Sequence, residues 1–426
     1  MSVLAWASVA VFLAAYALIA TERIHRLAAA LGGAGVMLAL RATDATAAFF
    51  SPHAGIDWNV IFLLLGMMVI VGVLRRTGVF EYLAIWAAKR ARGRPFRLLA
   101  LLVLITAAAS ALLDNVTTVL LVAPVTFVVC ERLAVPPAPF LIAEVMASNI
   151  GGTATLIGDP PNIIIAGRGG LSFNDFLAHV APMVVVLLAV FVVLCRLMFG
   201  RALRHDPARA AAVMALDERA AIADPRLLRR SLSVLAVVLV AFVLHPVLHY
   251  EPSVVALLGA GVLVAVTEVR AEQAVAEVEW PTLVFFAALF VMVGALVETG
   301  VIGTLSTAAA SATAGRPEVA TIGLLGVSAA LSAIVDNIPY VATMSPIVDH
   351  LVQAGGHRSL WWALAFGADL GGNATAVGAA ANVVVLGIAA RNGTPIGFWH
   401  FTRYGLIVTT VTVALVVPYL WLRYLL

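Results

Sequence analysis

The sequence predicts an all-α polytopic membrane protein built as an inverted repeat, with about ten transmembrane helices, two re-entrant hairpins and two broken helices. Three observations lead to this prediction. The composition is 62% hydrophobic and 12% charged, whereas soluble domains carry about 25% charged residues. Several apolar runs approach the roughly 20 residues that span a bilayer. Polar motifs inside such runs occur twice, about half a chain apart.

The duplication includes both polar motifs in the same order. Residues 110–115 (SALLDN) return as residues 332–337 (SAIVDN), and residues 149–155 (NIGGTAT) return as residues 369–375 (DLGGNAT). Matching interruptions in the two halves of a hydrophobic chain indicate the binding site of a secondary transporter. The repeat is therefore expected to be structural and to carry the polar site with it.

Residues 1–199 form the first predicted repeat. The stretch at about 97–131 is interrupted by Asp114-Asn115 and flanked by charged residues at both ends, which predicts a re-entrant hairpin that enters from the cytoplasm. Residues 140–167 contain glycines and prolines that disfavour a continuous helix, which predicts a broken helix lining a polar cavity. Apolar or amphipathic patterns predict helices at residues 3–20, 26–41, 59–75, 78–92 (interfacial) and 176–199.

Residues 231–426 form the second predicted repeat, after a basic cytoplasmic linker at residues 200–230. Five crossings in the first half require the second half to be inserted upside down. The charges agree with this topology, because cytoplasmic loops hold most Lys and Arg. The expected elements are helices at 231–248, 253–267, 281–297 and 400–424, a hairpin at 319–353 and a broken helix at 360–390. Of the 26 Lys and Arg, those expected outside are Arg41, Arg168, Arg316, Arg358 and Arg423.

Ionisable and amide side chains at membrane depth are costly unless they are paired or hydrated, so they are candidates for function. Asp159 is the weakest candidate, because its equivalent is Ala379, and it is also interpreted as a cap for the helix that begins at Pro160-Pro161. Asn115 and Asn337 have a structural alternative as helix caps. The predicted substrate- and ion-binding residues are Asp114, Asn115, Thr117, Asn149, Thr153, Thr155, Asp159, Asn162, Asp336, Asn337, Asp369, Asn373, Thr375 and Asn382.

The charges of the motifs limit the substrate. No Lys or Arg lies in either hairpin tip or helix break, so a multiply charged anion has no fixed counter-charge there. A cation or an uncharged polyhydroxy solute suits the site better. The two cysteines lie outside the motifs, so no thiolate is expected at the site. No cofactor or dedicated metal centre is expected, and the coupling ion is H⁺ or Na⁺, with Na⁺ at the same carboxylates.

The motifs resemble the ion transporter superfamily. Residues 113–118 (LDNVTT), 123–126 (APVT), 142–145 (IAEV) and 149–165 (NIGGTATLIGDPPNIII) are similar to the branch that holds ArsB arsenite permeases, NhaD-type sodium/proton antiporters and the melanosomal P protein. The resemblance implies scaffold and transport parts, an elevator-like or rocking movement, and a homodimer. The dicarboxylate branch has Ser-Asn-Thr at each hairpin tip, where this chain has DNVT and DNIP, which puts carboxylate transport in doubt.

The predicted function is secondary active transport, with proton-coupled efflux of arsenite or antimonite as the leading hypothesis. These solutes travel as uncharged trihydroxides at neutral pH. The alternative is a sodium/proton antiporter, and an anion symporter or a passive channel is less favoured. An enzyme is not expected. Paired intramembrane aspartates could suggest an aspartyl protease, but a protease needs only two facing carboxylates, whereas here each Asp lies in an entire duplicated module. The expected partners are a small inorganic solute and the lipid bilayer of the cell inner membrane, without nucleic acid.

Overall fold

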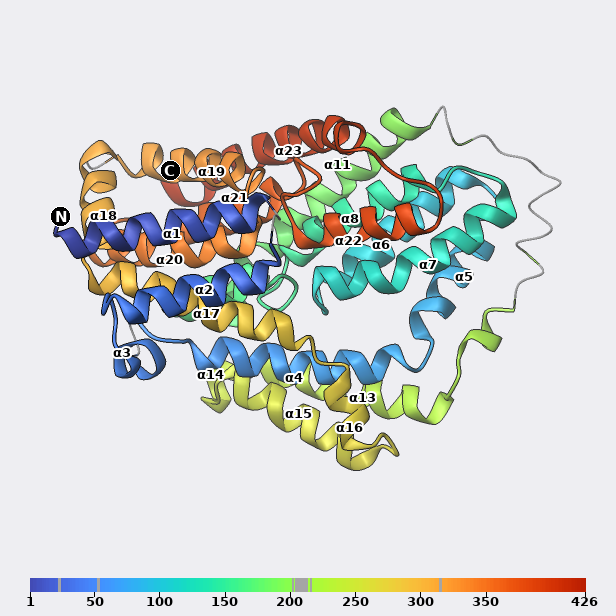
Figure 1. Cartoon of the computed structure of the whole chain (residues 1–426). Helices are drawn as coiled ribbons and strands as arrows, with labels where there is room; N and C mark the ends of the chain where they lie inside the picture. The colour runs from blue at the N-terminus through green and yellow to red at the C-terminus, as the bar shows by residue number, and fades with distance from the viewer. Residues whose placement is uncertain (22–23, 52–53, 201–202, 204–213, 215–216, 314–315) are drawn as a thin grey trace.

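The protein folds into a bundle of helices in which two interrupted regions meet near the centre (Figure 1). The computed structural model describes all residues except 22–23, 52–53, 201–202, 204–213, 215–216 and 314–315. Within the described residues every regular element is a helix, which confirms the predicted all-α class.

The first half contains helices close to the expected positions. They are α1 (Val3–Thr21), α2 (Arg26–Ala39), α4 (Trp58–Arg75), α5 (Val79–Arg90) and α11 (Ala181–Phe199). Two short helices, α3 (Ala45–Phe50) and α10 (Phe173–His179), are additional to the prediction. Each begins at a side-chain cap, Asp44 for α3 and Ser172 for α10. Such caps satisfy amide groups that have no partner within the helix.

The first half is interrupted in two places. Helices α6 (Pro95–Ser110) and α7 (Asn115–Leu133) flank a break at residues 111–114, and α8 (Ala138–Gly152) and α9 (Pro160–Gly169) flank a break at residues 153–159. The sequence predicts unwinding from Asn149 onward, but residues 149–152 continue α8. The glycines are tolerated inside the helix, and the new helix begins at the two prolines, which are compatible with the first helical positions.

The second half repeats this order after the linker, of which η1 (Arg219–Ala221) is described. Its hairpin consists of α19 (Pro317–Ser332) and α20 (Asn337–Gln353), and its broken helix of α21 (Ser359–Gly371) and α22 (Ala380–Arg391). The remaining helices are α13 (Pro225–Val243), α14 (His245–Leu248), α15 (Pro252–Val266), α16 (Ala271–Ala276), α17 (Trp280–Glu298), α18 (Val301–Thr313), α23 (Phe398–Leu420) and η2 (Trp421–Leu425).

Helix contacts recur between the halves with exchanged partners. Helix α6 packs along α8 as α19 packs along α21, while α4 packs on α15 as α17 packs on α2. Helix α9 contacts α20, and its counterpart α22 contacts α7. In Figure 1 the two hairpins extend toward the middle from opposite sides. This exchange is the pattern of a pseudo-two-fold arrangement, whereas the repeat boundaries and the orientation of each half in a membrane stay predictions.

The described end of the linker docks against the start of α5. The Ala223 amide donates to the Thr77 carbonyl at 3.0 Å, and Lys89 forms an ion pair with Glu218. Gly78, which directly follows Thr77, has φ +79°, a left-handed conformation that favours glycine. The linker thereby attaches the second half of the chain to α5 of the first half.

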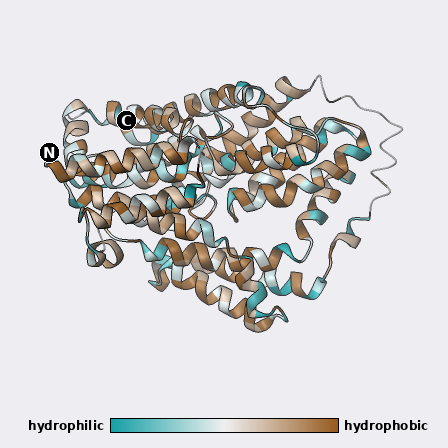
Figure 2. Ribbon diagram, in the orientation of Figure 1, coloured by the Kyte–Doolittle hydropathy of each residue, from teal (hydrophilic) through white to brown (hydrophobic). Residues whose placement is uncertain are grey.

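The apolar character of the helices makes the chain a multi-pass membrane protein. Figure 2 shows hydrophobic residues along most helices, with hydrophilic residues mainly at helix ends and near the breaks. By length and composition, 5 described helices suffice to cross a membrane: Trp58–Arg75, Asn115–Leu133, Ala181–Phe199, Trp280–Glu298 and Phe398–Leu425. One of them is α7, the second arm of the predicted hairpin, so length alone does not separate hairpin arms from crossing helices. The predicted count of ten stays a prediction.

Glycines allow each broken helix to lie against its hairpin. A Cβ atom on Gly151 would lie 2.3 Å from the Ala107 carbonyl oxygen, and one on Gly371 would lie 2.6 Å from the Ala329 carbonyl oxygen. Small residues permit such close approach of helices in membrane proteins. The duplicated glycines therefore set α8 against α6 and α21 against α19, next to the breaks.

Replacing either glycine is expected to destabilise the protein. Gly151→Ala and Gly371→Ala should each cost about 1–3 kcal/mol, because the added methyl group overlaps backbone atoms that cannot rotate away. The matched control is Gly261→Ala on the exposed face of α15, where a Cβ atom meets open space. Alanine there should be neutral or stabilising by up to about 1 kcal/mol. Thermal unfolding of the detergent-purified variants measures the difference, and equal melting of Gly151→Ala and wild type would contradict the packing described.

Candidate functional site

Each hairpin tip begins its second helix with an aspartate cap. Asp114 Oδ1 accepts a hydrogen bond from the Thr117 amide at 2.7 Å, and Asp336 Oδ1 accepts one from the Ile338 amide at 3.1 Å. An Asp at this position satisfies an amide that has no partner within the helix. The caps are therefore these aspartates and not the asparagines that follow them, which corrects the capping alternative for Asn115. The asparagine side chains are left for other contacts.

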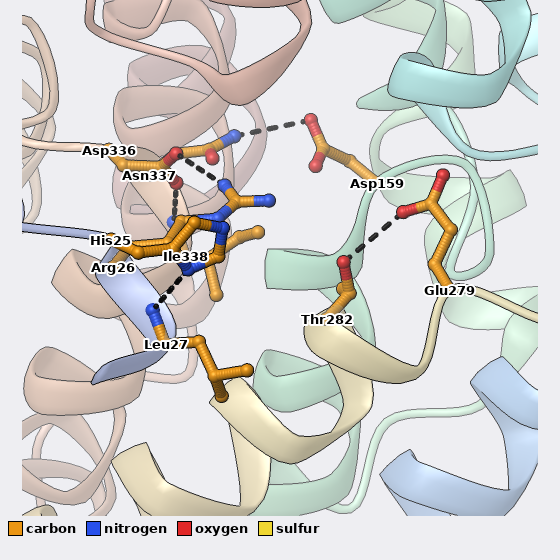
Figure 3. A network of polar contacts seen from close by, with 9 residues as sticks. All are labelled: His25, Arg26, Leu27, Asp159, Glu279, Thr282, Asp336, Asn337 and Ile338. Carbon is orange, nitrogen blue, oxygen red and sulfur yellow. Dashed lines mark hydrogen bonds and ion pairs between the residues drawn. The ribbon is translucent and has the colours of Figure 1, made fainter. Parts of the chain in front are cut away.

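Asp159 is the point at which the two hairpin tips meet. Its Oδ2 atom accepts hydrogen bonds from Asn115 Nδ2 at 2.9 Å and from Asn337 Nδ2 at 3.3 Å; Figure 3 shows the second of these. Asp159 occupies the N-cap position of α9, but its side chain accepts no bond from the helix. Pro160 and Pro161 carry no amide hydrogen, and the Asn162 amide donates to the Asp159 carbonyl oxygen at 3.0 Å. The interpretation of Asp159 as a helix cap therefore holds for its position and its backbone and not for its side chain.

Asn149, in the last turn of α8, connects the first half to the second broken helix. Its Nδ2 atom donates to Asn373 Oδ1 at 3.0 Å and to Asn382 Oδ1 at 3.1 Å, and its Oδ1 atom accepts from Asn115 Nδ2 at 3.2 Å. These four side chains are buried. Buried polar groups need such partners, so one amide network holds both halves together at the centre.

A duplicated pair of asparagines holds the unwound segments in shape. Asn162 Nδ2 donates to the carbonyl oxygens of Gly152 and Thr155, at 3.3 and 3.1 Å. Asn382 makes the two equivalent bonds in the second half, both at 2.8 Å. Carbonyl groups released by a helix break are costly to bury without a donor. These two amide groups therefore stabilise the breaks, and their oxygen atoms remain for other partners.

The predicted threonines bind backbone atoms. Thr155 Oγ1 donates to the Ala111 carbonyl oxygen at 2.5 Å, and Thr375 makes the equivalent bond in the second half, also at 2.5 Å. Thr153 Oγ1 donates to the Asn149 carbonyl oxygen at 2.8 Å. Thr155 and Thr375 thereby fasten each break to the tip of its own hairpin, so that a hairpin and its break form one connected unit.

Asp369 is the second carboxylate at the centre. It is fully buried, has Thr153 and Asn162 as polar neighbours, and lies close enough to Asp159 for the two charges to repel. Neither of its oxygens has a hydrogen-bond partner, and the same holds for Asp159 Oδ1 and Asn162 Oδ1. Buried carboxylates without partners require a proton or a cation. The centre therefore contains four buried oxygens without a donor.

Two residues at the site lie outside the predicted set, Arg26 and Glu279. Both line a cavity of about 40 Å³ beside Asp114, which is room for a few water molecules. Arg26 Nη1 lies 3.8 Å from Asp336 Oδ2, and Glu279 Oε2 accepts from Thr282 Oγ1 at 3.1 Å (Figure 3).

Arg26 corrects the expectation that the site has no fixed positive charge. It begins α2, outside the duplicated motifs, so motif reasoning could not find it. Glu279 could have been noticed in the sequence, because it is a longer acidic residue at the position equivalent to Asp57. Asp57 caps α4 through the amides of Asn59 and Val60. Glutamate at this position caps nothing, and its longer side chain reaches the cavity instead.

These features define a class of protein. Duplicated helix breaks that share a buried polar centre, in a multi-pass membrane protein, are the architecture of a membrane transporter. The chain belongs to the citrate transporter family, whose family model matches residues 16–367.

Relatives support this assignment. The chain is 57% identical over 421 residues to a protein of Mycobacterium tuberculosis named uncharacterized transporter Rv2684, with 98% of each chain covered. It is 56% identical to the 46 kDa membrane protein of Mycobacterium leprae, covering 100% of this chain and 99% of the relative. It is 34% identical to the P protein of Homo sapiens, covering 93% of this chain and 57% of the P protein. The predicted resemblance to the P protein branch is confirmed.

Two solved transporter structures have the same fold. The YdaH transporter of Alcanivorax borkumensis gives a TM-score of 0.59 at 17% identity, with 84% of each chain covered. MtrF of Neisseria gonorrhoeae gives a TM-score of 0.64 at 12% identity, covering 100% of this chain and 96% of that one. At these identities the likeness concerns the fold alone.

The amide of Asn382 is expected to contribute to stability. Asn382→Ala leaves two break carbonyls without their donor, and each unsatisfied buried group costs about 1–3 kcal/mol. Asn392→Ala is the matched control, because Asn392 Nδ2 also bonds a carbonyl, that of Ile388 at 2.9 Å, but lies at the exposed end of α22. Thermal unfolding should show a clear loss for Asn382→Ala and little change for Asn392→Ala. Equal unfolding temperatures would contradict the role assigned to this amide.

Proposed function

We propose that the protein is a proton-coupled secondary transporter in which Asp159 and Asp369 bind the coupling ion. One observation carries the proposal: Asp159 accepts hydrogen bonds from both hairpin tips. Movement of either tip changes the donors of this carboxylate and therefore its affinity for a proton. A binding affinity that differs between conformations is the physical basis of coupling.

The proposed substrate is a small uncharged polyhydroxy solute, with arsenite or antimonite as the specific case and efflux as the direction. Asparagine and threonine side chains at the centre can hydrogen-bond the hydroxyl groups of such a solute. Free citrate, which the family description names, is a poor match for the site. Three acidic residues, Asp114, Asp336 and Glu279, surround the single positive charge of Arg26, and they would repel a citrate anion. Citrate would fit here only together with cations.

The second candidate is a sodium/proton antiporter. It is supported by the oxygens of Asp159, Asn162 and Asp369 that lack partners, because carboxylate and carbonyl oxygens suit hard cations. In this case the solute site and the coupling site are the same. Both candidates share an elevator-like or rocking movement of the hairpins and a homodimeric assembly, which we include in the proposal.

Purified protein in proteoliposomes tests the substrate. With an imposed pH gradient, arsenite should accumulate against its concentration gradient, and a proton uncoupler should abolish this accumulation. Parallel assays use radioactive sodium and citrate, the latter with and without divalent cations. Gradient-driven sodium flux without arsenite flux would establish the second candidate in place of the first. Flux that is indifferent to the uncoupler would overturn proton coupling.

Asp159→Asn and Asp369→Asn should each lower gradient-driven flux by about tenfold or more, because an interaction with a buried charge contributes about 1.5–3 kcal/mol. Asp114 is not used for this test, because its side chain caps α7. Asp349→Asn is the matched control on α20, since Asp349 bonds Gln353 at 2.9 Å near the exposed helix end. Wild-type flux in both Asp159→Asn and Asp369→Asn would refute the assigned ion site.

A further inference from the structure

Glu144 is a buried carboxyl group outside the site described above. It lies in the middle of α8 with 2% of its surface exposed. Its Oε1 atom accepts a hydrogen bond from Thr126 Oγ1 on α7 at 2.6 Å, and its Oε2 atom has no partner. Ionisable residues inside membrane segments are rare and usually functional.

The surroundings of Glu144 supply no counter-charge. Glu144 takes part in none of the ion pairs formed by the described residues. Helices α6, α7, α11, α21 and α22 pack against α8, and the titratable neighbour that they bring to Glu144 is Cys130 of α7. An isolated carboxylate in an apolar interior is very costly, and a proton is the counter-charge that needs no additional ligand.

A further polar residue lies near Glu144 on α8. Ser148 follows Glu144 by one helical turn and therefore lies on the same face of α8. Ser148 Oγ is 3.1 Å from the Asn115 carbonyl oxygen and 3.0 Å from Ser110 Oγ. The bond from Asn115 to Asp159 comes from a different group, the Asn115 side-chain amide. Ser148 therefore places a hydroxyl group on the face of α8 that carries Glu144, in contact with the first hairpin.

The second half of the chain shows that the fold does not need these polar groups. Val348, Leu364 and Ala368 occupy the positions equivalent to Thr126, Glu144 and Ser148. The helix contact itself is retained, because Ser332 Oγ donates to the Ala368 carbonyl oxygen at 2.6 Å and Ser110 Oγ donates to the Ser148 carbonyl oxygen at 2.8 Å. The same packing is thus built once with these polar residues and once without them.

We infer that Glu144 is a second proton-binding site, separate from Asp159 and Asp369. The Glu144 carboxylate takes up a proton from water and releases it again, and no other bond changes. This inference rests on the proposed proton coupling. It adds a proton-binding residue in the first half of the chain, where the second half has Leu364 at the equivalent position. Glu144 positions the proton and has no contact with the solute.

Infrared difference spectroscopy of the purified protein tests proton binding without transport. A pH change should produce a carboxylic acid C=O band that is absent in Glu144→Gln and retained in Glu131→Gln, the control at the exposed end of α7. Thr126→Val removes the hydrogen bond to Oε1 and should shift this band, which provides a second test if Glu144→Gln does not fold. A spectrum without a band dependent on Glu144 would overturn the inference.

Transport assays test the role of this proton. Glu144→Gln should lose most gradient-driven flux, while exchange of solute for solute without a gradient continues. Glu144→Leu, which copies the second half, should behave in the same way. Wild-type gradient-driven flux in Glu144→Gln would show that Glu144 only connects α7 to α8. If the wild-type protein shows no proton-driven flux, the proposed function fails, and the infrared result alone decides whether Glu144 binds a proton.

Discussion

The structure depends on one buried carboxylate that receives its hydrogen bonds from two hairpins far apart in sequence. Asp159 accepts from Asn115 of the first hairpin and from Asn337 of the second. A buried negative charge is very unfavourable unless donors surround it, and here neither half can supply both donors alone. The arrangement of the two halves is therefore tied to the state of this single side chain.

The surrounding elements make this meeting possible. Aspartate caps begin the second helix of each hairpin, and glycines let the broken helices approach the hairpins closely. Asn162 and Asn382 satisfy the carbonyl groups that the breaks release. These roles are local and are duplicated in the two halves. The bonds from Asn149 to Asn373 and Asn382 are different, because they join the halves.

The helical class could be predicted from the hydrophobic composition. The interrupted regions and most of the polar residues at the centre could be predicted because their motifs occur twice in the sequence. The partners of these residues could not be predicted. That Asp159 binds both hairpin tips depends on contacts across 44 and 178 residues, which no local pattern encodes. Arg26 could not be found for the same reason, since its position beside Asp336 follows from how α2 packs in the fold. The exact end of α8 was misplaced, because glycine signals flexibility whereas tertiary packing kept the helix intact.

Asp159 has Ala379 as its counterpart, and Asn149 has Asp369. In the proposed transport cycle, interchanging the shapes of the two halves would convert an inward-facing form into an outward-facing one. Chemically identical halves would give the two forms equal free energy. With the carboxylates placed unequally, the two forms of the proposed carrier would differ in free energy, and the empty carrier would have a preferred resting side.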